Sequence, residues 1–282
     1  MVEHRRFGNL LPHLILLIGV AIVAFPVYLA VIASTHDNAV IANGQMPLLP
    51  GTHGFETYWN TIVSGTGRTT RQPVGGMMLN SLIMALGIAA GKIAISIISA
   101  YAIVFFAFPF RMTAFWTIFI TLMLPVEVRI FPTYKITSDL HMLDSYAGLI
   151  LPLIASATAT LLFRQFFMSV PKELVEASKI DGAGPVRFFF DTLLPLSVTN
   201  IAALFVILFI YGWNQYLWPL LITTRDDMQT IVIGIKKIID VHDALTEWQV
   251  AMATAVLAML PPVAVVVLMQ RLFVKGLIET EK

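Results

Sequence analysis

The sequence predicts an all-α, polytopic membrane protein with six transmembrane helices. Of its 282 residues, 57% are hydrophobic and only 12% are charged. The mean hydropathy of +0.81 is far above that of an ordinary soluble domain. Six apolar runs each approach or exceed the about 20 residues that a helix needs to cross a bilayer. These runs are residues 14–34, 79–105, 113–131, 145–166, 200–222 and 250–273.

The segments outside these runs predict an orientation. The first run is longer than the ~7–15 apolar residues of a signal peptide, so we expect a retained signal anchor. Lys and Arg favour the side of the two termini if both termini are cytoplasmic. Residues 1–13, 167–199 and 274–282 are then cytoplasmic, and the hydrophilic loop 35–76 is periplasmic and caps the core formed by residues 77–273.

Composition argues against several functional classes. Eighteen basic residues against 17 acidic ones give no basic surface for nucleic acid. No cysteine is present, which excludes disulfides and iron–sulfur clusters, and the six histidines lack metal-ligand spacing. A P-loop-like string at residues 87–92 is one residue short and lies in an apolar run, so we interpret it as helix packing. We therefore expect no enzymatic activity, no cofactor and no metal.

Residues 171–195 form a charged segment between the fourth and fifth runs. Pro171 suits the first turn of a helix, and Gly182 suits a left-handed helix end, which predicts a helix over residues 172–181. A second helix is expected over residues 186–194, ended by Pro195. The product is a helix–glycine–helix element that projects from the membrane.

One face of the first of these helices is narrow and carries small side chains. Leu174, Ala177, Ser178 and Asp181 share this face at helical spacing. Such a face suits docking into a groove of another protein, and an amphipathic helix on the lipid surface is the alternative. Small side chains and the shortage of Lys favour the protein partner.

The same segment resembles the EAA loop of ABC-importer permeases. The matching positions are Glu176, Ala177, Gly182, Leu194 and Pro195; Asp181 precedes the glycine, while Ser178 and Thr192 depart from the family pattern. In that family the loop is a coupling helix that sits in a cleft of the cytoplasmic ATPase. The resemblance implies that these residues, with Ser178 and Asp181, couple ATP hydrolysis to the membrane helices.

Further stretches resemble the second, six-span permease of the carbohydrate-importer branch, and within it the sn-glycerol-3-phosphate importers. They are residues 120–133, 143–149, 156–167, 211–220 and 270–277. The resemblance implies a bacterial inner-membrane complex with a homologous permease, two copies of an ATP-binding subunit and a periplasmic substrate-binding protein. The expected cargo is sn-glycerol 3-phosphate, with glycerophosphodiesters as further candidates.

Polar residues inside the apolar runs are candidates for the substrate path because burying them in lipid is costly. We expect Trp213, Asn214, Tyr216 and Arg129 to lie along it. The alternative for the tryptophans is an interfacial aromatic belt, which fits Trp218 best. For Arg129, Glu127 and Lys92 we favour structural pairing over substrate contact, with Lys92 hydrogen-bonded to a neighbouring helix.

Three rival functions stay open at this point. The same machinery could import a sugar or oligosaccharide, since the motifs are common to the branch. An ion-coupled secondary transporter would need acidic residues in its membrane helices, and most acidic residues here lie in loops. A membrane-embedded enzyme would need a catalytic constellation, and the sequence contains no recognisable one.

Overall fold

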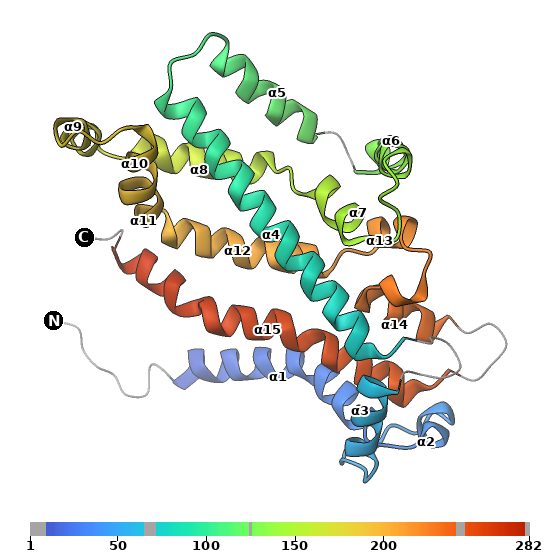
Figure 1. The fold of residues 1–282 in the computed structure, drawn as a ribbon. Coiled ribbons are helices and arrows are strands. Elements are labelled where there is room, and N and C mark those ends of the chain that lie inside the picture. The colour runs from blue at the N-terminus through green and yellow to red at the C-terminus, as the bar shows by residue number, and fades with distance from the viewer. Residues whose placement is uncertain (1–9, 65–71, 124–125, 241–245, 280–282) are drawn as a thin grey trace. The chain divides into compact units, whose positions relative to one another are not determined.

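The computed structural model describes residues 10–64, 72–123, 126–240 and 246–279, and these form helices and connecting loops (Figure 1). The longer helices are α1 (Leu10–Ala33), α4 (Val74–Phe105), α5 (Arg111–Met123), α6 (Val126–Asp139), α8 (Ala157–Ser169), α12 (Val198–Trp213) and α15 (Trp248–Glu279). The shorter ones are α2 (Asn38–Ala42), α3 (Gly54–Val63), α7 (Tyr146–Ile150), α9 (Lys172–Ile180), α10 (Pro185–Phe188), α11 (Leu194–Leu196), α13 (Leu217–Ile222) and α14 (Ile231–Ile239). The chain divides into two compact units: Met1–Met77 with Ile233–Leu260, and Met78–Val232 with Pro261–Lys282.

In the first unit, the loop after α1 folds back on the end of that helix. The backbone N–H of Gly51 donates to the Thr35 hydroxyl (2.8 Å), and the N–H of His53 donates to the Thr35 carbonyl (3.1 Å). Ser34 donates to the hydroxyl of Tyr58 on α3 (2.9 Å). These bonds give the described part of loop 35–76 a defined structure.

The second unit is built around α4. A buried apolar cluster joins α4, α6, α7 and α13 through Met84, Ile88, Ile130, Leu149, Trp218 and Ile222. Helices approach α4 closely where glycine leaves room. A Cβ added to Gly212 would lie 2.9 Å from the Cα of Ala85, and one added to Gly87 or Gly91 would lie 2.6 Å from Ile150 or Ile154. The packing interpretation of residues 87–92 is confirmed.

Three helices of the described chain are long and apolar enough to cross a membrane, namely Leu11–Ala33, Val74–Phe105 and Trp248–Gln270. Two bent pairs raise the number to five if each pair is one span. The pair Tyr146–Leu153 and Ala157–Ser169 is bent by 50°, and the pair Pro185–Leu196 and Val198–Trp213 by 70°.

The expected third run, residues 113–131, is divided between α5 and α6. Each of these helices is about 20 Å long, which is shorter than the ~30 Å hydrocarbon core. Pro125, which lies between these two helices, is outside the described residues. The count of six spans therefore stays a proposal.

Candidate functional site

The segment after α8 has the helix–glycine–helix form that the sequence predicts. Helix α9 ends at Ile180 and is capped by Asp181, and Gly182 has φ +71°, which confirms the left-handed helix end. The N–H of Gly182 donates to the carbonyl of Lys179 (3.1 Å), and the N–H of Ala183 to that of Ser178 (3.0 Å). This pair of bonds is a Schellman motif, which satisfies the last helical carbonyls.

We call α9 the first arm and the helical stretch after Gly182, Pro185–Leu196, the second arm. The second arm differs from the prediction of one helix over residues 186–194 ended by Pro195. Its parts are α10, a π-helical stretch over Phe189–Leu193, and α11, in whose first turn Pro195 lies. Leu193 and Leu194 before the proline and Ser197 after it have right-handed helical backbone, so the helical stretch continues through Pro195. The chain instead breaks at Ser197, before α12.

The small-residue face of α9 is turned toward this second arm. Leu174, Ala177, Ser178 and Asp181 line a hollow of about 280 Å³ between the two arms. Glu176 does not line the hollow and is exposed, and Leu194 and Pro195 lie beyond it on α11. The structure thus brings together only part of the predicted coupling set.

Apolar side chains that the sequence analysis did not select are also exposed on this element. Ile180 is 85% exposed and Val186 is 71% exposed, on the two sides of the Gly182 turn. Two large apolar residues flanking a glycine turn in a charged segment were the signal that could have identified them. They give the turn between the two arms, which we call the tip, an apolar surface.

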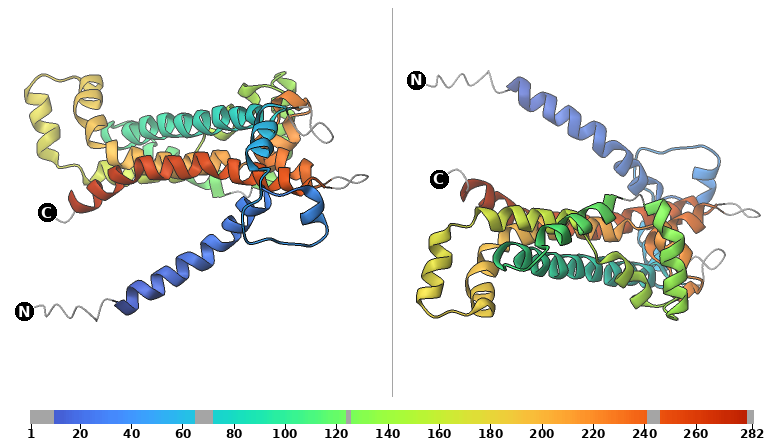
Figure 2. Two further views of the ribbon diagram at one scale, coloured as in Figure 1. Left: turned by 90° about the horizontal axis from the view of Figure 1, so that it is seen from below. Right: turned by 90° about the horizontal axis from the view of Figure 1, so that it is seen from above.

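An aromatic joint connects the second arm to the membrane helices. We use this name for Tyr101, Phe105, Phe106, Phe163, Phe166, Phe167, Phe188, Phe189 and Phe190, which come from α4 and its C-terminal end, from α8 and from the second arm. Figure 2 shows the two arms at the end of α4, with α9 running across the direction of that helix.

Ring contacts within the joint span three chain segments. The Phe105 ring on α4 lies 5.4 Å from Phe188 and 5.9 Å from Phe167 on α8, measured between centroids. The Tyr101 ring lies 5.0 Å from Phe189, and its hydroxyl donates to the carbonyl of Pro185 (2.8 Å). Such ring pairs contribute about 0.5–1.5 kcal/mol each beyond their buried area. Displacement of the second arm would therefore act directly on α4 and α8.

Three of the predicted path residues, Trp213, Asn214 and Tyr216, lie at a break in the fifth apolar run. Helix α12 ends at Trp213 and α13 begins at Leu217, so Asn214 and Tyr216 are in non-helical backbone. Non-helical backbone at membrane depth is tolerated where protein buries it or where it lines a water-filled cavity. Asn214 is exposed on the isolated chain. Its amide is thus available to a partner or a solute.

The two tryptophans flanking this break are buried. Trp213 is 2% exposed and stacks on Phe209, with ring centroids 6.0 Å apart. Trp218 is 3% exposed and donates its indole N–H to the carbonyl of Gly148 (3.0 Å). The interfacial-belt interpretation of Trp218 is therefore wrong, because the residue belongs to the core around α4.

Lys92 and Arg129 lie near this break as well. The Lys92 ammonium sits over the Tyr211 ring, 3.9 Å from its centroid, where a hydrogen bond to a neighbouring helix was expected. Arg129 is half-buried at the start of α6, close enough for its charge to act on Lys92. The side chain of Glu127 lies outside the described residues.

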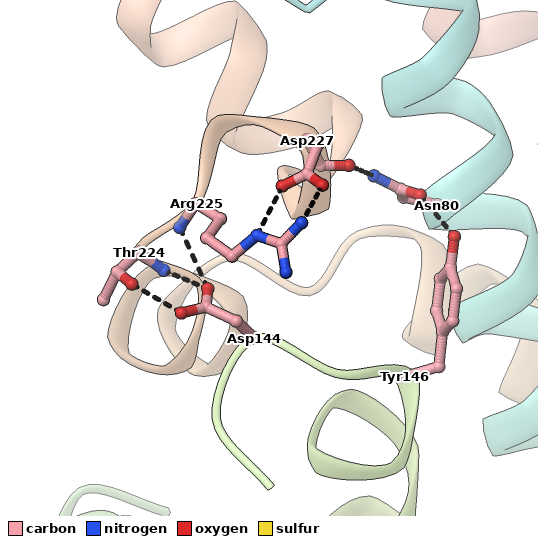
Figure 3. A network of polar contacts seen from close by, with 6 residues as sticks. All are labelled: Asn80, Asp144, Tyr146, Thr224, Arg225 and Asp227. Atoms are coloured by element: carbon pink, nitrogen blue, oxygen red, sulfur yellow. Dashed lines mark hydrogen bonds and ion pairs between the residues drawn. The ribbon is translucent and has the colours of Figure 1, made fainter.

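A polar network holds the opposite end of α4 (Figure 3). It consists of Asn80, Asp144, Tyr146, Thr224, Arg225 and Asp227. The Asp144 carboxylate accepts the N–H groups of Thr224 (2.6 Å) and Arg225 (2.9 Å) and the Thr224 hydroxyl. Arg225 makes a two-pronged ion pair with Asp227.

Asn80 connects this network to α4. It donates to the carbonyls of Asp227 (2.8 Å) and Gln229 (3.0 Å), and it accepts the Tyr146 hydroxyl (2.7 Å). The turn before α7 and the loop after α13 are thereby tied to one point on α4.

Electrostatics favour the charged form of this network. Partial burial alone would raise the pKa of Asp144. The Thr224 hydroxyl, the N–H groups of Arg225 and Thr224 and the charge of Arg225 outweigh it and hold that pKa below its ordinary value of 3.8. The hydrogen bond and charge of Asp227 raise the pKa of Arg225. Both groups are therefore ionised near neutral pH.

Comparison with known proteins identifies the family. The family model of binding-protein-dependent transport system inner membrane components matches residues 77–279. The chain belongs to this family. It is a multi-pass inner-membrane permease and a non-catalytic component of a binding-protein-dependent ABC transporter, which implies ATPase and binding-protein partners. Family membership sets aside the ion-coupled transporter and the membrane-embedded enzyme.

Full-length relatives of the permease are also known. It is 59% identical to the "sn-glycerol-3-phosphate transport system permease protein UgpE" of Rhizobium meliloti (strain 1021), 60% to that of Agrobacterium fabrum (strain C58 / ATCC 33970) and 56% to that of Escherichia coli O157:H7. Each alignment covers 100% of both chains.

A solved structure has the same fold. It is the crystal structure of a bacterial ABC transporter involved in the import of the acidic polysaccharide alginate. The TM-score is 0.79 at 19% sequence identity, and the match covers 96% of this chain and 98% of the other. This likeness supports an ABC-importer permease fold for the permease.

Proposed function

We propose that the permease carries sn-glycerol 3-phosphate, with glycerophosphodiesters as further candidate cargo, through an ATP-driven importer. The observation that carries this proposal is the identity of 56–60% over the whole chain to three permeases named for sn-glycerol-3-phosphate transport. The non-helical break at Asn214–Tyr216, with its exposed Asn214, is consistent with passage of a polar solute.

The proposed assembly follows from the coupling element. Glu176, Ala177, Ser178, Asp181 and Gly182 contact the ATPase, and the fold continues through the second arm, with Leu194 and Pro195, into α12. Closure of the ATPase dimer moves α9, and the aromatic joint passes that motion to α4 and α8. The exposed apolar tip around Ile180 and Val186 supports docking on a protein surface.

In this proposal the permease has six spans and cytoplasmic termini, with the coupling loop 167–199 on the same side. It pairs with a homologous permease, and two ATP-binding subunits and one periplasmic binding protein complete the complex. The substrate passes between the two permeases, past Trp213, Asn214, Tyr216 and Arg129.

Uptake into proteoliposomes tests the proposal. The complete complex with its binding protein is supplied with labelled sn-glycerol 3-phosphate or with labelled maltose, with and without ATP on the ATPase side. ATP-dependent uptake of the phosphate ester alone is expected. Uptake of maltose instead would keep the mechanism and refute the cargo, and uptake without ATP would refute the coupling role of α9.

A further inference from the structure

Lys92 is a buried cation at mid-depth in a membrane helix. It lies about 20 Å along α4 from the C-terminal end and about 27 Å from the N-terminal end. Its exposed fraction is only 7%. A buried charge in a membrane is costly unless an opposite charge or a set of hydrogen bonds compensates it.

The described residues supply compensation only through the face of an aromatic ring. The contact recorded for Lys92 is the Tyr211 ring, and within the described chain no carboxylate forms an ion pair with it. Arg129 places a second positive charge nearby, because Ile130, which follows it, packs in the same buried cluster as Ile88, one helical turn before Lys92. Two neighbouring cations repel each other, so this arrangement favours an anion between them.

We propose that Lys92 and Arg129 form a cationic site that holds the phosphate group of the transported ester as it crosses the membrane. This inference rests on the proposed function. A phosphate monoester carries about 1.5–2 negative charges at pH 7, which matches two cations. The planar guanidinium suits two-pronged contact with phosphate oxygens, and the ammonium acts as a point charge.

The position of Tyr211 connects this site to the predicted path. Tyr211 is in the last turn of α12 before the break, so the Lys92 ammonium over its ring lies against that turn. The Tyr211 carbonyl also accepts a hydrogen bond from the Gln215 side-chain amide (3.1 Å). Asn214, which is exposed, is one turn of chain away. An anion drawn to Lys92 would therefore be next to the non-helical stretch.

Uptake kinetics of charge-removing variants test the site. Lys92→Met and Arg129→Gln are assembled with the partner subunits in proteoliposomes, beside the matched control Lys135→Met, which changes an exposed lysine on α6. The apolar Met side chain suits a buried membrane position better than an uncompensated ammonium does. Measured quantities are uptake of labelled sn-glycerol 3-phosphate, ATP hydrolysis stimulated by the loaded binding protein, and the amount of partner permease in the complex.

We expect Lys92→Met and Arg129→Gln each to lower kcat/KM for uptake about tenfold or more, as loss of a charge-assisted contact implies. Stimulated ATP hydrolysis and subunit content should stay near the unsubstituted level, and Lys135→Met should behave like the unsubstituted complex. Normal uptake by Lys92→Met would overturn the inference. Loss of the partner permease from that variant would also overturn it, because the counter-ion would then be a carboxylate of the partner. If the unsubstituted complex imports no phosphate ester at all, the proposed function itself is refuted.

Discussion

The two ends of α4 are held by different kinds of interaction. Near Tyr101 and Phe105, packed rings join the helix to the second arm. At Asn80, about 31 Å away along the helix, hydrogen bonds hold it to a network that contains the Arg225–Asp227 ion pair. Ring packing is weakly directional and can adjust while contact is kept, whereas the polar network is lost when its geometry changes.

This difference suggests separate duties for the two ends in the proposed transport cycle. The aromatic joint transmits force, since it can keep contact while the arms move. The polar network fixes the position of the turn before α7 relative to the loop after α13. Its hydrogen bonds form or are lost together.

The largest effect should come from opening the aromatic joint. Phe188→Ala removes a ring that is 6% exposed and contacts Phe105, and truncation of a buried Phe costs about 3–5 kcal/mol. We expect stimulated ATP hydrolysis to continue while uptake of labelled substrate collapses. Phe188→Leu, which keeps apolar volume, is the control and should retain most uptake; equal uptake by the Ala variant would contradict the role of the joint.

At the other end, Asp144→Ala should lower the free energy of unfolding by about 1–3 kcal/mol, because two N–H groups lose their acceptor. Thermal unfolding of the detergent-solubilised complex measures the change. Asp144 has φ +50°, which Asn tolerates, so Asp144→Asn isolates the loss of charge and should cost less. An unchanged unfolding midpoint for Asp144→Ala would show that the polar network does not stabilise the fold.

The pH dependence of this end follows from the lowered pKa of Asp144. A carboxyl whose pKa is depressed by folding stabilises the fold above its ordinary value of 3.8, and that contribution is lost as pH falls through the folded value. The midpoint difference between the unsubstituted chain and Asp144→Asn should therefore be constant from pH 5 to 8, in a comparison of thermal unfolding at each pH. A difference that shrank between pH 6 and 5 would contradict the assigned ionisation.

A smaller effect is expected at the turn between the two arms. Gly182 has φ +71°, so Gly182→Asp strains the backbone by an amount of order 1–2 kcal/mol at most, although an added Cβ would meet nothing within 4 Å. Uptake should fall while insertion in the membrane is kept. Gly184→Asp is the matched control, because Gly184 has φ −71° and equally open surroundings. Equal uptake by both variants would show that the left-handed turn does not matter.

The smallest effect should come from Tyr101→Phe. This change removes the hydrogen bond to the Pro185 carbonyl and keeps the ring contacts, so about 0.5–1.5 kcal/mol is at stake. Coupling of uptake to hydrolysis should weaken by a few-fold at most. A loss of coupling as large as that of Phe188→Ala would mean that the hydrogen bond, not ring packing, transmits motion through the aromatic joint.

Features set by local chemistry could be predicted from the sequence. The left-handed turn at Gly182 and the helix predicted over residues 172–181, which is observed over Lys172–Ile180, depend on proline and glycine positions within a few residues. The break at residues 214–216 was not predicted, because the apolar run resumes after it and the polar pair Asn214 and Gln215 is short.

Features that depend on distant contacts escaped prediction. The polar network pairs Asp144 with Thr224 and Asn80 with Asp227, which are far apart in the chain. The burial of Trp218 likewise depends on Gly148, whose carbonyl it needs as an acceptor. The contact of Lys92 with the Tyr211 ring also joins two helices, and the sequence did not predict it.

The number of substrate molecules imported per ATP hydrolysed tests the account most directly. It is measured in proteoliposomes for the unsubstituted complex, for Phe188→Ala and for Phe188→Leu, with sn-glycerol 3-phosphate as substrate. The account predicts that this ratio falls steeply in Phe188→Ala, with hydrolysis preserved, and stays near the unsubstituted value in Phe188→Leu. Uptake and hydrolysis that fell in parallel, leaving the ratio unchanged, would contradict coupling through the aromatic joint.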